Sequence, residues 1–301
     1  MNTFSPSDFK IIRSLTDEKN RKFNRVYLCE HIISGDKFVL KYIKKTDKNQ
    51  KHLQKLLFEA NLQFKHTSLP NFIGIYQNEN ELFCFKKFVE ASPINIFFKK
   101  LKYSKTEFIR LFLNKIEPVF AEIQTMGLVH SDIKPSNILI EKNEKDFNVH
   151  LIDFGLSFYP NETNRELVYS LSYSAPELVL NLLDLACHKT DIYSLGICLF
   201  QLFEGEIPFK QSHPGMITHL QINSPLEFSY KTPKKWREII QKMCVKQPLL
   251  APPHQINIEK QKEIIQKGIE GRYNSIKEIN KVIENIIPKD YGVKKWFFFR
   301  R

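Results

Sequence analysis

Short runs of alternating hydrophobic and polar residues dominate the first 90 positions of the chain. Such alternation predicts β-strands, because successive side chains of a strand point to opposite faces of a sheet. A helix is expected at 49–65, where Leu53, Leu56, Leu57, Ala60 and Phe64 recur at helical spacing. The expected strands are FKIIRSL (9–15), RVYLCEHI (25–32), KFVLKYIKK (37–45), FIGIYQ (72–77) and ELFCFKKF (81–88).

After about Ala91 the pattern changes to longer segments with helical periodicity. The sequence therefore predicts an α+β protein, with a small antiparallel-sheet lobe (9–90) that carries one main helix and a larger, mostly helical lobe (91–301). An irregular stretch at 247–255 precedes an inserted helix. The helices expected in the larger lobe cover 108–127, 190–205, 236–244, 256–268 and 275–287.

The formal net charge of +12 does not alter the predicted fold class. A basic chain suits an anionic partner such as a nucleotide, an acidic peptide, a nucleic acid or a membrane surface. Lys is spread along the whole chain together with abundant Asn and Ile, which favours a solvated surface over dedicated nucleic acid binding.

The five cysteines are odd in number and have no paired spacing, which argues against a disulfide framework and a zinc site. A reducing compartment follows, and we expect a cytoplasmic protein. The amino terminus has no apolar stretch of signal-peptide length, and charged residues flank the most apolar window, 193–203. No membrane span is expected.

Three polar residues with chemical potential stand in the apolar segment VHSDIKPSNIL (129–139). The carboxylate of Asp132 can take a proton from a hydroxyl, the ammonium of Lys134 can sit against a phosphate, and the amide of Asn137 can ligate a metal. Asp153 follows in LIDFGLSF (151–158). A base and two oxygen ligands are what magnesium-assisted phosphoryl transfer requires.

A lysine and a glutamate in the first lobe form a second candidate group. Lys41 lies in the alternating strand FVLKYIK, and Glu59 lies on the helix that follows. A buried strand lysine is costly unless an anionic group meets it. We therefore expect Lys41 and Glu59 to form an ion pair.

Together and in this order, the motifs resemble those of the eukaryotic-type (Hanks-type) protein kinases, over about residues 9–287. The resemblance implies one protein kinase domain (1–301) with a bilobal kinase fold and ATP and Mg²⁺ as cofactors. It also implies that Lys41 grips the inner phosphates, that Glu59 is its partner and that Val26 contributes to the nucleotide site.

By the same resemblance, Asp132 is the catalytic base and Lys134 its companion in serine/threonine kinases. Asn137 and Asp153 become the magnesium ligands. A protein substrate with a Ser or Thr acceptor is implied.

Six further positions match structural or accessory positions of the family. SAPEL closes the activation segment with Ala175, Pro176 and Glu177, a short motif at 175–177. The resemblance implies that Asp191 braces the catalytic loop, that Arg272 pairs with Glu177, and that Ser170 touches the base and its lysine.

The glycine-rich loop of the family is degenerate in this chain. Its three glycine positions fall on Lys19, Arg21 and Asn24. Glycines there let backbone N–H groups approach phosphates. Either Lys19, Arg21 or Lys22 reaches the nucleotide, or the loop is a solvated turn and nucleotide affinity is weak.

Ser131 stands where many relatives have an arginine that binds a phosphate on the activation segment. Serine cannot replace the guanidinium fork. Activity is therefore expected not to depend on phosphorylation of Thr163, Tyr169 or Ser172.

Two other segments depart from the pattern or leave it open. In FKKFVEAS (85–92), Lys86 or Lys87 occupies a position that is usually apolar or acidic. The tail VKKWFFFRR (293–301) either binds a membrane surface or partner groove, or packs on its own lobe or frays.

Three functions fit these observations: an active Ser/Thr kinase, a pseudokinase that acts as a nucleotide-binding scaffold or allosteric partner, and a kinase of small-molecule hydroxyls. The complete set of Lys41, Asp132, Asn137 and Asp153 favours the first. The missing glycines motivate the second, and the presence of SAPEL weakens the third.

Overall fold

The computed structural model describes residues 4–15, 24–101, 104–144, 146–160 and 170–286. They form two compact units, one within residues 1–90 and one within residues 91–301. The units meet along the chain between Glu90 and Ala91, where the sequence pattern changes.

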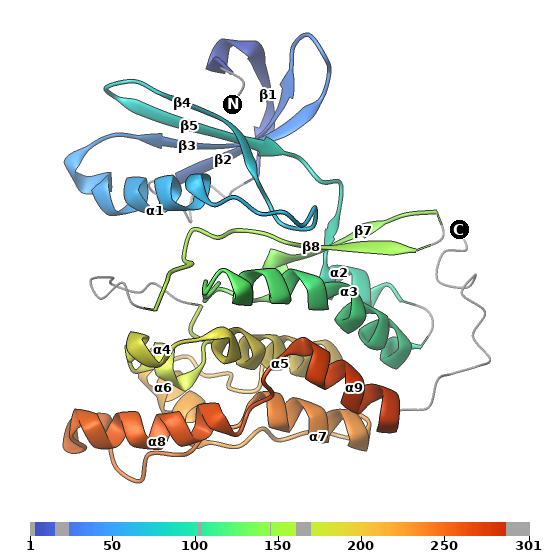
Figure 1. Ribbon diagram of the computed structural model, residues 1–301, viewed down its shortest axis with the longest axis vertical. Coiled ribbons are helices and arrows are strands. Elements are labelled where there is room, and N and C mark those ends of the chain that lie inside the picture. The colour runs from blue at the N-terminus through green and yellow to red at the C-terminus, as the bar shows by residue number, and fades with distance from the viewer. Residues whose placement is uncertain (1–3, 16–23, 102–103, 145, 161–169, 287–301) are drawn as a thin grey trace. The chain divides into compact units, whose positions relative to one another are not determined.

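The first unit is a five-stranded antiparallel sheet in the order β1-β2-β3-β5-β4 (Figure 1). A 3₁₀ helix, η1 (Pro6–Asp8), precedes the sheet, and η2 (Asp47–Asn49) leads into helix α1 (Gln50–Asn61). All five predicted strands are confirmed. They are β1 (Phe9–Ser14), β2 (Asn24–His31), β3 (Lys37–Lys44), β4 (Phe72–Gln77) and β5 (Glu81–Lys87).

Helix α1 is confirmed, but its predicted end near Lys65 is wrong, because it ends at Asn61. The side chain of Asn71 explains the difference. Its Oδ1 accepts a hydrogen bond from Phe64 N at 2.8 Å, and its Nδ2 donates to Phe64 O at 2.7 Å. The backbone N–H and C=O of Phe64 therefore have hydrogen-bond partners without a further helical turn, so α1 does not need to continue through this residue.

The two faces of this sheet carry different cores. In the antiparallel register Ile43 lies opposite Leu82, and both pack with Leu56 and Ala60 of α1. Because side chains alternate along a strand, the intervening residues form the other core, built from Phe9, Cys29, Phe38, Leu40 and Phe85. Helix α1 thus covers one face, which is the face that holds Lys41.

The second unit is mostly helical, as predicted, and a small sheet of order β6-β7-β8 accompanies the helices. The helices are α2 (Ile94–Lys99), α3 (Lys105–Thr125), α4 (Pro176–Val179), α5 (His188–Glu204), α6 (Pro214–Asn223), α7 (Lys234–Met243), α8 (Ile258–Glu270) and α9 (Ile276–Ile286). The strands are β6 (Ser92–Pro93), β7 (Ile138–Lys142) and β8 (Phe147–Leu151), and the 3₁₀ helices are η3 (Pro135–Asn137), η4 (Leu183–Leu185) and η5 (Pro253–Gln255).

Capping side chains mark the starts of two of these helices. Helix α3 begins before its predicted start at 108, because Ser104 accepts a hydrogen bond from Glu107 N and caps an earlier turn. In the same way Asn257 accepts from Lys260 N and sets the start of α8. Side-chain caps of this kind fix where the first turn begins.

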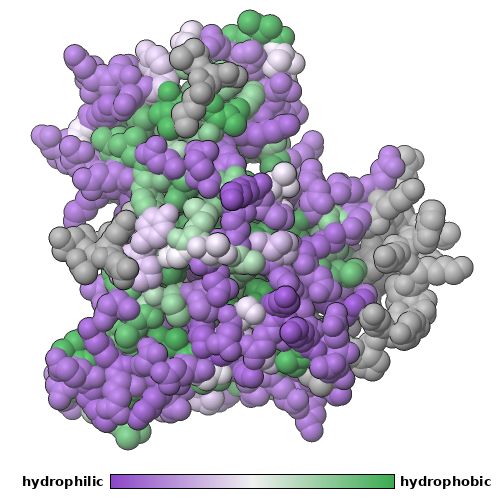
Figure 2. Space-filling view, viewed as in Figure 1, coloured by the Kyte–Doolittle hydropathy of each residue, from purple (hydrophilic) through white to green (hydrophobic). Residues whose placement is uncertain are grey.

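Helix α5 is the core of the second unit. Its residues from Thr190 to Glu204 are almost all buried, so it is apolar around most of its circumference. It approaches α7 closely at Gly196, where an added Cβ would lie 2.5 Å from Cys244 Sγ. None of the described helices is both long and apolar enough to span a bilayer. On the face shown in Figure 2, hydrophilic residues predominate.

Candidate active site

The loop that carries Asp132 lies between α3 and β7 in the second unit. Gly127 turns the chain out of α3 with φ of 68°, a left-handed conformation that favours glycine. Val129 then forms an isolated antiparallel bridge with Phe158. The bridge fixes the loop to the segment that follows Asp153.

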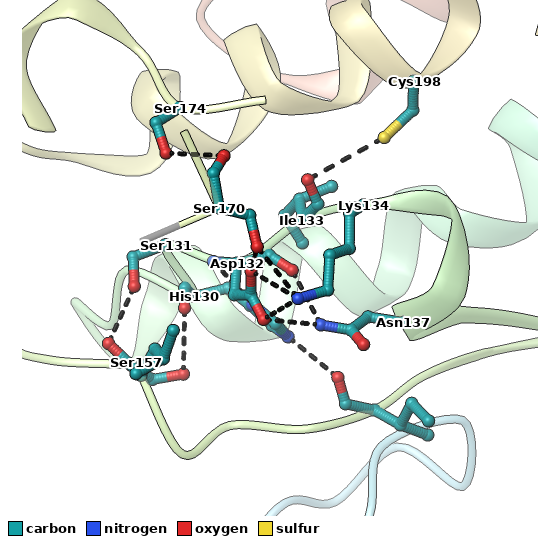
Figure 3. A network of polar contacts seen from close by, with 12 residues as sticks. His130, Ser131, Asp132, Ile133, Lys134, Asn137, Ser157, Ser170, Ser174 and Cys198 are labelled. Carbon is teal, nitrogen blue, oxygen red and sulfur yellow. Dashed lines mark hydrogen bonds and ion pairs between the residues drawn. The ribbon is translucent and has the colours of Figure 1, made fainter. Parts of the chain in front are cut away.

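The carboxylate of Asp132 is the centre of a polar network (Figure 3). Its Oδ1 accepts from Ser170 Oγ at 2.6 Å and from Lys134 Nζ at 3.0 Å. Its Oδ2 accepts from Lys134 Nζ at 2.8 Å and from Asn137 Nδ2 at 2.9 Å. Asp132 is only 4% exposed, and these charge-assisted bonds offset the cost of burying its charge.

Ser170 makes both contacts predicted for it. Besides its bond to Asp132, its Oγ accepts from Lys134 Nζ at 2.9 Å. The backbone carbonyl of Ser170 accepts from Ser174 Oγ at 3.1 Å and from Tyr173 N at 2.9 Å. The segment that leads into α4 therefore holds the hydroxyl in place.

The two candidate metal ligands, Asn137 and Asp153, belong to segments that are joined through the backbone. Ile152 N donates to Asn137 O at 2.9 Å, and His130 Nε2 lies 3.2 Å from Ile152 O. Both hydrogen bonds of the Asn137 side chain use Nδ2 and run to Asp132, so Oδ1 is the atom suited to a cation. Asp153 adopts φ of 69°, a strained conformation for a residue other than glycine.

This donor set fits magnesium. Mg²⁺ prefers oxygen ligands, keeps several waters and is usually bound through one or two carboxylates together with substrate phosphates. Asn137 and Asp153 supply an amide and a carboxylate oxygen. Within the described residues no group of three or more His, Cys, Asp or Glu side chains forms a metal cage.

Asp191 at the start of α5 braces the loop, as predicted. Its Oδ2 accepts from His130 N at 2.8 Å and its Oδ1 from Ser131 N at 2.9 Å. Two consecutive N–H groups reach one carboxylate because Ser131 is left-handed, with φ of 62°. Burial raises the pKa of Asp191 to about 7, and the two backbone hydrogen bonds oppose that shift.

Ser131 has a contact that the sequence did not reveal. Its Oγ donates to Leu156 O at 2.7 Å, and Ser157 Oγ donates back to His130 O at 3.3 Å. Hydrogen bonds between uncharged groups thus tie the start of the activation segment to the loop where many relatives have an arginine. Activity was predicted not to depend on phosphorylation of Thr163, Tyr169 or Ser172, and the first two of these lie outside the described residues.

The predicted pair of Arg272 and Glu177 is confirmed. Nη1 of Arg272 lies 2.6 Å from Oε1 of Glu177, and Nη2 lies 3.0 Å from Oε2, which is bidentate geometry. Thr190 Oγ1 donates to the same carboxylate at 2.8 Å. The side chains of the pair are 1% and 0% exposed.

In the first unit, the predicted pair of Lys41 and Glu59 is also confirmed. Lys41 Nζ donates to the two carboxylate oxygens of Glu59 at 2.8 Å and 2.6 Å. Val26 lies opposite Lys41 in the register of β2 and β3 and is buried. Its expected role in nucleotide binding stays a prediction.

Lys86, which the sequence only flagged as unusual, lies next to this ion pair. It is 7% exposed, whereas Lys87 is exposed. Its Nζ lies 3.7 Å from Glu59 Oε1. The alternation of Leu82, Cys84 and Lys86 along β5 was the available signal, because it assigns all three to the face that α1 covers.

Two of the predictions fall on parts of the chain that lie outside the described residues. They concern the glycine-less loop, with Lys19, Arg21 and Lys22, and the tail at 293–301. Asn24 begins β2, and its backbone alone is described. The alternatives given for both segments stay open.

Comparisons with known proteins agree with this arrangement. Residues 22–263 match the family model described as the protein kinase domain. A "probable serine/threonine-protein kinase" of Dictyostelium discoideum is 25% identical over 97% of this chain and 63% of its own length. Calcium-dependent protein kinase 12 of Arabidopsis thaliana is 28% identical over 75% of this chain and 48% of its own.

A third relative, myosin light chain kinase 2 of Rattus norvegicus, is 29% identical over 62% of this chain and 31% of its own. The matched region is thus less than two thirds of the length of each of these relatives.

Proposed function

Because the chain belongs to the protein kinase domain family, we propose that it is an active kinase that transfers the γ-phosphate of ATP to Ser or Thr hydroxyls of a protein. One observation carries the proposal. The carboxylate of Asp132 is held at once by Lys134, Asn137 and Ser170, so a base, a cation and a metal-ligating amide form one preorganised group. Phosphoryl transfer depends mainly on such positioning and on charge neutralisation.

Each of these residues has a definite task in the reaction. Asp132 orients the acceptor hydroxyl and accepts its proton, and the ammonium of Lys134 offsets the negative charge of the transferring phosphate. Ser170 restrains both side chains through its hydroxyl. Asn137 and Asp153 would hold Mg²⁺, which neutralises phosphate charge when it is bound.

The first unit contributes the residues that grip the nucleotide. Lys41 binds the inner phosphates, and Glu59 fixes its ammonium by accepting on both oxygens. A lysine held in this way has little rotamer freedom left to lose when ATP binds, which lowers the entropic cost of binding.

Two alternatives make different demands on the chain. A pseudokinase that acts as a scaffold is suggested by the absence of glycine at Lys19, Arg21 and Asn24, but it has no need of an intact network around Asp132. A kinase of small-molecule hydroxyls has no need of the segment from Ser170 to α4, which in this chain holds Asp132 and Lys134. The acceptor is therefore proposed to be a protein, and the cysteine spacing leads us to propose a cytoplasmic location.

Transfer of labelled phosphate tests the proposal. The parent protein is incubated with ATP, Mg²⁺ and a generic basic or acidic protein, beside the variants Asp132→Asn and Lys41→Met. Lys44→Met is the matched control, because Lys44 lies on the same strand and is exposed. Transfer is expected in the parent and the control only. Equal background labelling in all four proteins would refute the proposed kinase activity. Thermal stabilisation by ATP without phosphate transfer would support the pseudokinase scaffold.

A further inference from the structure

Two buried lysines of the first unit converge on one carboxylate. Lys41 lies opposite Cys84 in the register of β3 and β5, and Lys86 lies two residues further along β5. Lys41 and Lys86 are therefore diagonal neighbours on the face of the sheet that α1 covers. Their side chains are 10% and 9% exposed, and Glu59, which both contact, is 2% exposed.

The two contacts differ in kind. Lys41 Nζ donates to both oxygens of Glu59, at 2.8 Å and 2.6 Å, whereas Lys86 Nζ lies 3.7 Å from Oε1. The second contact is thus an attraction between charges at a distance longer than a hydrogen bond. The ammonium of Lys86 also lies 5.4 Å from the ring centroid of Phe72, within the range of a cation–π interaction.

Packing alone does not account for a lysine at this position. Leu82 and Cys84 precede it on the same face of β5 and belong to the core against α1, so an apolar side chain would continue that row. A second buried ammonium next to Lys41 adds desolvation and repulsion. We therefore look for a favourable interaction of the Lys86 ammonium that offsets this unfavourable free energy, and Glu59 provides one.

We propose that Lys86 is a positioning residue for Lys41, and this inference rests on the proposed function. When the ammonium of Lys41 also binds a nucleotide phosphate, it is shared between two anions and its interaction with Glu59 weakens. Lys86 then keeps the carboxylate compensated and in place, so that Lys41 can serve the phosphate without leaving a buried charge behind. Lys86 thus favours the nucleotide-bound state.

Removing the charge of Lys86 should weaken nucleotide binding more than it slows transfer. Without Lys86, the ammonium of Lys41 is the cation next to Glu59, so Glu59 and the nucleotide phosphate compete for it. We expect Lys86→Met to raise KM for ATP about tenfold and to leave kcat within about twofold. A tenfold change corresponds to a modest part of the Coulomb energy between Lys86 and Glu59 at 3.7 Å. Lys86→Arg, which keeps the charge, should restore KM. Lys44→Met, at an exposed residue at the end of β3, should leave both constants unchanged.

A second background separates this role from simple packing. In the Glu59→Gln protein the carboxylate that Lys86 is proposed to compensate is gone, so adding Lys86→Met should have no further effect on KM. A packing role predicts the same loss in both backgrounds and overturns the inference. If circular dichroism shows that Lys86→Met is unfolded, Lys86→Gln takes its place in the same cycle.

Calorimetric titration with ATP and Mg²⁺ distinguishes this inference from the proposed function. A parent that binds ATP and transfers no phosphate refutes the kinase activity alone. Weaker binding by Lys86→Met than by the parent still supports the role of Lys86. Equal affinity of the two proteins refutes that role, whether or not transfer occurs.

Discussion

Replacing Arg272 by Met should destabilise the protein strongly, because it leaves the carboxylate of Glu177 buried without its cation. The guanidinium supplies two hydrogen bonds to Glu177, and among the residues that the structure describes the other side-chain donor to that carboxylate is Thr190. It also donates to Val245 O at 3.0 Å and lies 4.9 Å from the centroid of the Tyr193 ring.

The expected loss follows from burial and not from the ion pair as such. Breaking a buried pair on one side costs about 3–5 kcal/mol. At about 2 °C per kcal/mol for a chain of this size, the melting temperature should fall by about 6–10 °C. Adding Glu177→Gln to Arg272→Met should recover much of the loss, since no buried charge then remains.

An exposed pair with the same separation provides the control. Lys262 Nζ lies 2.6 Å from Asp184 Oδ2, as Arg272 Nη1 does from Glu177, but its side chains are 40% and 51% exposed. Solvent screening should limit the cost of Lys262→Met to about 1 kcal/mol or less. The assay is thermal unfolding followed by circular dichroism. Equal shifts for Arg272→Met and Lys262→Met, or no recovery in the double variant, would refute the reasoning.

Three further changes give separate tests. Ser170→Ala removes a donor to the catalytic carboxylate and should lower kcat about tenfold, whereas Ser172→Ala, nearby in the same loop, should leave the rate of phosphate transfer unchanged. Ser131→Ala removes the bond to Leu156 O, so amide hydrogen exchange in the segment after it should accelerate while the melting temperature falls by only a few degrees. Burial lowers the pKa of Lys246 from 10.5 to about 7, whereas the unfolded chain keeps its proton to higher pH, so this residue makes stability rise between pH 7 and pH 9. The free energy of unfolding of the parent should therefore increase over that range relative to Lys246→Met, by at most about 1.4 kcal/mol per pH unit because one proton is involved, and the melting temperature should rise with it.

The sequence by itself predicted the five strands and the helix of the first unit, and the long helices of the second. The strands of the first unit and the long helices of the second follow from local periodicity, which the chain displays whatever its tertiary packing. The pair of Lys41 and Glu59 was predictable from a general cost, because a strand lysine on a buried face requires an anion. The pair of Arg272 and Glu177 followed only from the resemblance to a family.

The tertiary structure alone decided the contacts between distant residues of ordinary type. Ser131 donates to Leu156 O from a left-handed conformation, with φ of 62°, in which its own N–H and that of His130 both reach the distant carboxylate of Asp191. Helix α1 ends at Asn61 because the side chain of Asn71, beyond the helix, forms hydrogen bonds with the backbone N–H and C=O of Phe64. Local patterns report which face a residue occupies, but not which atom on another element comes within hydrogen-bond distance. That is set by how the elements pack and how the chain turns between them.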